Sequence, residues 1–361
     1  MAIKKNSLIN SNTNNFSLND SNNRYYQRAL SYEIESMESK VVPEWPPIID
    51  FHPIVNRYHN ANVSGLDTDS EADWFDILVD RFGSFETGLS LGTGTGLHER
   101  LLQKKGFVKN WSTIDLSTTS QNSLDAEFSQ NNFENGDLNF ITLPVKKYDV
   151  VFCSNVLHHI VNLEHLLFEI NKTLTDDGLF LVYEFIGEDQ WEWSDKKLKI
   201  LNQKFKTKFE SRCSGLDFVK YPRWSLNERP LESIRSSELH SIIKYYFGNS
   251  AELEIVSDMM LFPIINSLVR CGLISKLEKD PKLLDEMLNF AVQLDKESML
   301  KEEDLLPCYL AGVYRKSEVS KPLLANSWSD AKIKQKLHLP LPLHLKSWKF
   351  IKKCIKRVLP L

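Results

Sequence analysis

Three glycines at alternate positions constrain this chain more than any other feature, in the run Leu89-Ser90-Leu91-Gly92-Thr93-Gly94-Thr95-Gly96. The run follows a predicted strand at 87–92 and precedes a predicted helix at 96–105. Glycines there allow a tight turn, and their missing side chains let a ligand approach the backbone and the unpaired N–H groups of the helix N-terminus. Asp115 ends the next predicted strand, where a carboxylate can bind two ribose hydroxyls. The segment therefore predicts a βαβ unit that binds a nucleoside-containing cofactor.

The glycine spacing bears on which cofactor is bound. Dinucleotide sites use G-x-G-x-x-G, with the pyrophosphate on the helix N-terminus. Here the third glycine, Gly96, comes one residue too early, and Leu97 occupies its place. The spacing suits a cofactor without a pyrophosphate, so it favours S-adenosyl-L-methionine over a nicotinamide dinucleotide.

Short apolar runs alternate with amphipathic segments through the middle of the chain, which is typical of a doubly wound, Rossmann-like α/β sheet. We expect further strands at 111–115, 132–137, 148–154 and 179–186, with helices at 118–130 and 162–174. Gly178 is expected to cap the last of these helices. A helix at 236–247 and extended runs at 252–263 and 306–315 would complete the sheet.

Composition and periodicity divide the chain into six parts. Residues 1–24 are rich in Asn and Ser and predict disorder, and 25–83 predict a helical extension with helices at 25–40 and 70–82. The cofactor-binding core is expected at 84–186, and a substrate lid at 187–235. Residues 236–316 would finish the sheet, and their helical block 264–302 either caps the pocket or forms a homodimer contact. Residues 317–361 predict a linker and a tail.

The tail differs from the rest in charge. The whole chain of 361 residues carries a net charge of −4, which gives no reason to expect nucleic-acid binding, yet residues 331–361 contain nine Lys and Arg and no acid. Within 346–359 the periodicity predicts a basic amphipathic helix with Trp348 on its apolar face. Contact with an anionic membrane surface is one expectation, and docking on the acidic body or on a partner protein are the alternatives.

Cysteine usage and hydropathy indicate the compartment. The five cysteines are widely scattered, so we expect neither a disulfide framework nor a metal site. No stretch approaches the length of an apolar membrane span. We expect a cytoplasmic protein, with peripheral contact at the inner face of the membrane if the tail binds lipid.

Residues 85–186 resemble the class I S-adenosylmethionine-dependent methyltransferases, of the broad methyltransferase-11/12 type. Four segments after the glycine loop carry the resemblance in the family's order: 113–117 (TIDLS), 136–138 (GDL), 148–160 (YDVVFCSNVLHHI) and 177–180 (DGLF). The run from Leu89 to Glu99-Arg100, together with 228–230 (ERP) and 233–236 (SIRS), is similar to a bacterial subgroup of uncertain substrate. One departure stands out, because the family usually has an acid two residues before the first glycine, where this chain has Ser90.

The resemblance implies that S-adenosyl-L-methionine is the cofactor and suggests which residues contact it. Asp115 corresponds to the ribose ligand, Asp137 to the adenine contact, and the end of the fourth strand to the methionine end of the pocket. The expected cofactor-binding residues are Ser90, Gly92, Thr93, Gly94, Gly96, Asp115, Leu116, Asp137, Leu138, Ser154 and Asn155.

Catalytic and substrate residues are less constrained, because the methyl donor is already activated and the protein mainly aligns the reactants. His158, His159 and Glu184 are weak candidates for a general base, each with packing or hydrogen bonding as the alternative role. Aromatic and Arg side chains in the expected lid would suit a sugar, an aromatic ring or an anion. We take Trp191, Trp193, Arg229 and Arg235 as candidate substrate residues.

The expected function is methyl transfer to a small molecule or a glycan-type precursor, with O-methylation favoured. Two alternatives stay open at this point. Ser90 and the tail are compatible with a non-catalytic cofactor-binding subunit of a larger complex, and a nicotinamide-dependent oxidoreductase is disfavoured by Leu97.

Overall fold

A computed structural model describes residues 15–16, 23–38, 52–64, 73–117, 133–213, 216–220, 229–270, 273, 277, 279–301, 304–318 and 328–329. The expected helices at 118–130 and 346–359 lie outside these residues. Asn15–Phe16 (β1) pairs antiparallel with Trp328–Ser329 (β9). Part of 1–24, expected to be disordered, therefore forms a short strand.

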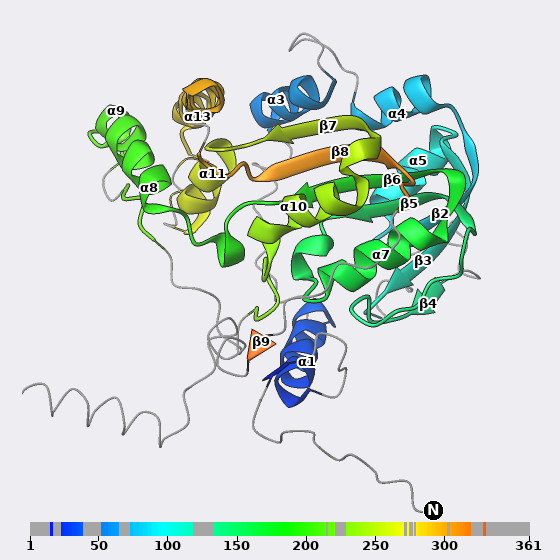
Figure 1. The fold of residues 1–361 in the computed structure, drawn as a ribbon. Coiled ribbons are helices and arrows are strands. Elements are labelled where there is room, and N and C mark those ends of the chain that lie inside the picture. Colours follow the sequence, from blue (N-terminus) through cyan, green and yellow to red (C-terminus); the bar gives the residue numbers. More distant parts are fainter. Residues whose placement is uncertain are drawn as a thin grey trace, which may run out of the picture.

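A seven-stranded sheet forms the centre of the fold, as the alternating pattern predicted (Figure 1). Its order is β4-β3-β2-β5-β6-β8-β7; the first five strands run parallel, and β8 runs antiparallel to both of its neighbours. In this order the strands span Phe133–Asn135, Val108–Asp115, Phe85–Leu91, Tyr148–Ser154, Leu174–Phe185, Tyr309–Arg315 and Ala251–Ser257.

Both faces of the sheet are covered, which explains the nearly continuous apolar runs in the central strands. Alternate residues of β5 face opposite ways: Val151 and Cys153 pack with α7 (Leu163–Thr173) and α10 (Ser236–Phe247), and Val150 and Phe152 pack with α4 (Trp74–Phe82) and α5 (Leu97–Lys104). Asp73 caps α4, with its side chain accepting from the Asp76 N–H at 3.0 Å.

Helices beyond the sheet form a second apolar core. They are α3 (Pro53–Ser64), α8 (Asp195–Leu201), α9 (Thr207–Phe209), α11 (Leu261–Arg270) and α13 (Pro281–Lys301). A π-helical segment at Asn202–Lys206 joins α8 to α9. Much of the expected lid is therefore helical and packs against the expected helical block 264–302. Helix α3 was not predicted from the sequence.

Two predicted boundaries are wrong. Helix α7 ends at Thr173, and the chain enters β6 directly at Leu174, so Gly178 lies inside a strand and caps no helix. The parallel pairing of Tyr148 with Leu174 explains this, because the sheet takes up the backbone groups that a cap would have satisfied. The extended run expected at 252–263 stops at Ser257, because Asp258 has a φ of +62° and α11 begins at Leu261.

Helix α1 (Arg24–Glu38) corresponds to the helix expected at 25–40 and lies near the carboxyl ends of β4 and β5 (Figure 1). Its Tyr26 and Ala29 are buried in one apolar cluster with Val161, Leu231 and Ile234. Within the described part of the chain, no helix is long and apolar enough to span a membrane.

Candidate functional site

The glycine loop leaves the carboxyl end of β2 and enters α5. Gly92, Gly94 and Gly96 all have left-handed backbones, with φ of +69°, +56° and +70°. A side chain at Gly92 would meet Val156 Cγ2 at 2.2 Å, which fixes the loop against the segment after β5. A Cβ at Gly94 would meet nothing within 4 Å, so the backbone there is open to a ligand.

Asp115 ends β3 beside this loop, as predicted, and is only 6% exposed. Its Oδ2 accepts the N–H of Gly94 at 2.9 Å, and its Oδ1 accepts the N–H of Ser117 at 2.8 Å. Each oxygen keeps a further lone pair, so the carboxylate can brace the loop and still bind hydroxyl groups. This arrangement fits a ribose-containing cofactor. Leu116, next to it, is half-buried.

Ser90 lies below the loop and contacts a residue that the sequence analysis did not assign to the site. Its hydroxyl donates to Glu99 Oε1 at 2.6 Å and lies 3.1 Å from Thr93 Oγ1. Glu99, in the first turn of α5, is 4% exposed, and burial raises its pKa to about 7. A carboxylate is therefore present next to Ser90 after all, supplied by the helix rather than by the strand.

Asp137, the expected adenine contact, follows β4 and is half-buried. Its Oδ2 accepts from the Tyr26 hydroxyl at 2.7 Å and its Oδ1 accepts from the Asn139 N–H at 3.0 Å, while Leu138 is buried. The contact with α1 was not predicted, because Tyr26 and Asp137 are far apart along the chain.

The segment after β5 carries the remaining cofactor candidates. Ser154 Oγ lies 3.0 Å from Nδ1 of His98, the neighbour of Glu99 on α5. Asn155 is exposed and has a left-handed backbone, with a φ of +51°. Both residues lie at the ligand-facing edge of the sheet, where the sequence analysis placed them.

His158 and Glu184 form a buried pair at the carboxyl ends of β5 and β6. One Glu184 oxygen accepts the N–H groups of Val156 at 2.8 Å and Leu157 at 2.6 Å, and the other contacts His158 Nδ1 and the N–H of Phe185. Glu184 is fully buried, and these hydrogen bonds hold the loop after β5 against β6.

His159 belongs to a cluster of charged groups with Glu33 of α1, Glu232 and Arg229. Its Nδ1 lies 3.1 Å from Glu33, and its Nε2 lies 4.0 Å from Glu232. Burial lowers the pKa of His159, but Glu232 and Glu33 together raise it above the usual value.

His158, His159 and Glu232 each offer one ligand atom within 4.8 Å of the others, a set that can hold a metal ion and that the sequence analysis missed. Arg229 already supplies a cation there, 2.5 Å from Glu232.

The candidate substrate residues lie mostly in the interior. Trp193 is fully buried, and Arg235 is 1% exposed and forms ion pairs of 2.7 Å with both Glu164 and Glu238. Trp191 is half-buried, with its ring centroid 6.1 Å from that of Phe185. Substrate contact through these side chains and through Arg229 therefore stays a prediction.

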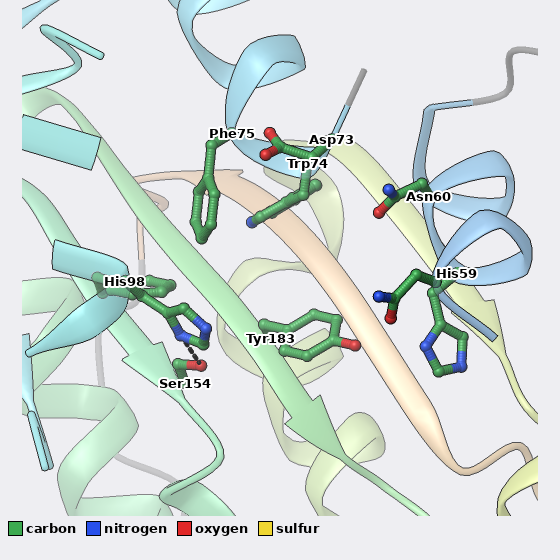
Figure 2. A pocket seen from close by; sticks show the side chains of 10 residues that line it. His59, Asn60, Asp73, Trp74, Phe75, His98, Ser154 and Tyr183 are labelled. Carbon is green, nitrogen blue, oxygen red and sulfur yellow. Dashed lines mark hydrogen bonds between the residues drawn. The ribbon is translucent and has the colours of Figure 1, made fainter. Parts of the chain in front are cut away.

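A cavity of about 390 Å³ lies between the sheet and the helices α3, α4 and α5 (Figure 2). Its walls combine amide, imidazole, hydroxyl and aromatic groups from Asn56, His59, Asn60, Asp73, Trp74, Phe75, His98, Phe152, Ser154 and Tyr183. His98 and Ser154 bring it next to the glycine loop, and Figure 2 shows His59 and Asn60 on α3 at the opposite side.

His59 is a further ionisable group that the sequence analysis missed. Its Nε2 lies 2.8 Å from Oδ2 of Asp258, a residue that is 1% exposed and has a left-handed backbone. Burial lowers the pKa of His59, but the Asp258 carboxylate raises it more, so the net pKa lies above its usual value. No local sequence pattern links the two residues, because the fold alone brings α3 to the end of β7.

Residues 68–212 match the family model of a methyltransferase domain. Similar solved structures include an S-adenosylmethionine-dependent methyltransferase from Mesorhizobium loti, with 18% identity over 68% of this chain and 99% of that chain, and a TM-score of 0.36. Another is phosphoethanolamine N-methyltransferase 2 of Haemonchus contortus in complex with S-adenosyl-L-methionine, with 15% identity over 77% of this chain and 61% of that chain, and a TM-score of 0.36. No curated protein matches the chain at a significant level.

The matched segment contains the glycine loop, Asp115, Glu99 and the loop after β5, which lie at the carboxyl edge of the sheet. The part of this chain that matches the family model, residues 68–212, is thus a methyltransferase domain with S-adenosyl-L-methionine as its cofactor.

Proposed function

We propose that this enzyme methylates a hydroxyl group of a small molecule or a glycan-type precursor bound in the cavity between α3, α4, α5 and the sheet. The observation that carries the proposal is the position of this cavity, which begins at His98 and Ser154 beside the glycine loop. An acceptor held there would be next to the methyl donor, and alignment of the two is the main task of such an enzyme.

The cofactor would lie along the carboxyl edge of β2, β3, β4 and β5, and when bound it supplies an activated methyl group. The open backbone at Gly94 and the carboxylate of Asp115 support this placement. The residues assigned to it are Ser90, Gly92, Thr93, Gly94, Gly96, Asp115, Leu116, Asp137, Leu138, Ser154 and Asn155.

The lining of the cavity favours a neutral, polar acceptor. Asn56 and Asn60 offer amide donors and acceptors, and the rings of Trp74, Phe75 and Tyr183 offer flat apolar faces, a combination that suits a hydroxylated ring. No Lys or Arg is among the described residues of the lining, so a phosphate or carboxylate on the acceptor would lack a cation here.

O-methylation requires the acceptor hydroxyl to lose a proton, and His59 is suited to accept it. With Nε2 bonded to Asp258, the other ring nitrogen, Nδ1, has no hydrogen bond from the described residues and can act as the base. Asp258 would fix the tautomer and stabilise the protonated ring, as a buried carboxylate does in other His–Asp pairs. The pair His158–Glu184 is the weaker candidate, because Glu184 is already saturated with backbone N–H groups.

Transfer of a labelled methyl group tests this proposal. The enzyme is incubated with S-adenosyl-L-methionine carrying a tritiated methyl group and with separated small-molecule, protein and RNA fractions of a cell extract. We expect base-stable label in the small-molecule fraction only. His59→Asn should lower the rate by about 10²-fold or more, the usual contribution of a general base, with the affinity for S-adenosylhomocysteine unchanged.

His240→Asn is the matched control, because His240 lies on α10 at the opposite face of the sheet and should keep the wild-type rate. Label that appears in protein or RNA, or a fully active His59→Asn variant, would contradict the proposed acceptor class or the proposed base.

A further inference from the structure

The side chain of Glu99 is a buried carboxylate in the first turn of α5, directly behind the glycine loop. It is 4% exposed, and its Oε1 accepts a 2.6 Å hydrogen bond from Ser90, the last polar residue of β2 before the first glycine. Thr93, within the loop, contacts the same Ser90 hydroxyl at 3.1 Å. The carboxylate is therefore tied to the loop through two hydroxyl groups.

No cation in the described part of the chain forms an ion pair with Glu99. The adjacent Arg100 guanidinium donates instead to the carbonyl oxygen of Thr95, at 3.0 Å. The carboxylate of Asp115 and the buried thiol of Cys153 are also near Glu99, and neither can neutralise a second carboxylate. A buried charge without a partner is unfavourable, so this site is set up to receive a positive group.

We propose that the Glu99 carboxylate, oriented by Ser90, binds the ammonium group at the amino-acid end of S-adenosyl-L-methionine and of its product. The inference rests on the cofactor placement proposed above. An ammonium group has three N–H donors for a carboxylate, whereas the sulfonium has none. The two carboxylates at the loop would bind different parts of the ligand. Asp115 bonds to Gly94, on the side proposed for the nucleoside, and Glu99 bonds to Ser90 at the base of the loop, where the amino-acid end would lie.

Calorimetry with two ligands isolates this contact. S-adenosylhomocysteine carries the amino-acid group, and 5′-methylthioadenosine keeps the adenine, ribose and sulfur but lacks it. For Glu99→Gln we expect at least a tenfold weaker affinity for S-adenosylhomocysteine and less than a threefold change for 5′-methylthioadenosine. Glu86→Gln is the control, because Glu86 is exposed at the start of β2 and should change neither affinity.

Moving the carboxylate provides a rescue. The double variant Ser90→Asp, Glu99→Gln carries its acid on the strand, next to the position of the Glu99 carboxylate in the wild type. Its affinity for S-adenosylhomocysteine should recover to within about threefold of wild type. Ser90→Ala removes only the hydroxyl that orients Glu99, and it should weaken S-adenosylhomocysteine selectively even if Glu99→Gln fails to fold. Thermal melting of each variant reports its folding.

The pH dependence gives an independent readout. Since burial raises the pKa of Glu99 to about 7, the ionised form increases between pH 6 and pH 8, and wild-type affinity for S-adenosylhomocysteine should rise about tenfold over this interval. Burial lowers the pKa of the neighbouring His98 and raises the pKa of the Cys153 thiol, so these two groups titrate on either side of Glu99. Glu99→Gln should abolish the rise.

Two results would overturn the proposal. An unchanged affinity of Glu99→Gln for S-adenosylhomocysteine would show that the ammonium binds elsewhere. Equal losses for S-adenosylhomocysteine and 5′-methylthioadenosine would show that Glu99 only shapes the loop. If the wild-type protein binds neither ligand, the cofactor placement itself fails, which is a different outcome from either of these.

Discussion

The hydroxyl group of Tyr26 on α1 donates a 2.7 Å hydrogen bond to the carboxylate of Asp137, directly after β4. This bond ties the N-terminal helix to the edge of the sheet that holds the cofactor candidates. Burial raises the pKa of Tyr26, and the Asp137 carboxylate raises it further, so the phenol stays protonated and remains the donor.

Removing the hydroxyl should therefore loosen α1. Tyr26→Phe leaves one oxygen of Asp137 without its donor and should destabilise the protein by about 1–3 kcal/mol. The measurement is urea unfolding followed by fluorescence. Tyr32→Phe on the same helix is the control, because no hydrogen bond of the Tyr32 hydroxyl is found among the described residues. Equal stability of the two variants would contradict a structural role for the bond.

Asp115 should matter for both the loop and the ligand. Asp115→Ala removes the acceptor of the Gly94 N–H and the proposed ribose ligand, and it should weaken S-adenosylhomocysteine by about 1–3 kcal/mol, or roughly 5- to 150-fold. Asp149→Ala is the control. Asp149 bonds to Thr87 at the amino-terminal ends of β5 and β2, far from the glycine loop along these strands, so its replacement should leave the affinity unchanged. An Asp115→Ala variant with wild-type affinity would place the ribose elsewhere.

Local patterns sufficed to predict the sheet and the positions of the glycine loop and Asp115 at the ends of β2 and β3. Alternating and continuous apolar runs predicted β2, β5 and β6 within a few residues at most boundaries, because these strands are buried on both faces. The glycine loop and Asp115 could be recognised because a tight turn and the end of a strand each depend on residues that are adjacent in the sequence.

The contacts around the cavity proposed for the acceptor were not predictable in the same way. We expected substrate residues in 187–235, where Trp193 and Arg235 are buried in the protein. His59 and Asp258 meet only because α3 packs beside the end of β7, and Glu99 meets Ser90 only through the turn of α5. Long-range pairs of single residues leave no periodic pattern in one sequence.

The basic tail gives a prediction that depends on sequence alone, because residues 330–361 lie outside those described. Six cationic residues from Lys346 to Arg357 would each contribute about 1 kcal/mol beside an anionic leaflet. Deleting 331–361 should therefore release the protein from phosphatidylserine vesicles at low salt without changing affinity for S-adenosylhomocysteine. Absence of vesicle binding by the full chain would favour the alternative of docking on the acidic body or on a partner.

The His59–Asp258 pair predicts a specific pH dependence. The base must be unprotonated, so kcat/KM for the acceptor identified by labelling should rise with pH through a midpoint above 6.5, because the pKa of His59 is raised. Asp258→Asn removes the stabilising charge while burial persists, and it should move the midpoint down. NMR titration of the His59 ring provides the same value without an acceptor. A midpoint below 6.5 in the wild type would instead point to His98, whose pKa burial lowers.

Arg235 provides a test that separates structure from substrate binding. Its guanidinium is almost fully buried, donates to both oxygens of Glu164 at 2.7 and 2.8 Å, and also donates to the carbonyl oxygen of Val161 at 2.7 Å. Arg235→Met should destabilise the protein by about 3–5 kcal/mol, because it leaves the Glu164 carboxylate buried without a cation.

Adding Glu164→Leu to Arg235→Met should recover most of this loss, since the double variant no longer buries an unpaired charge. Urea unfolding of the two variants measures the difference, and calorimetry with S-adenosylhomocysteine shows whether the cofactor site is intact. If the double variant is stable and binds the cofactor yet loses methyl transfer, Arg235 contacts the acceptor, and the substrate role expected from the sequence is restored. If it retains methyl transfer, Arg235 serves to join α10 to the N-terminal end of α7, and the acceptor is recognised in the cavity beside α3.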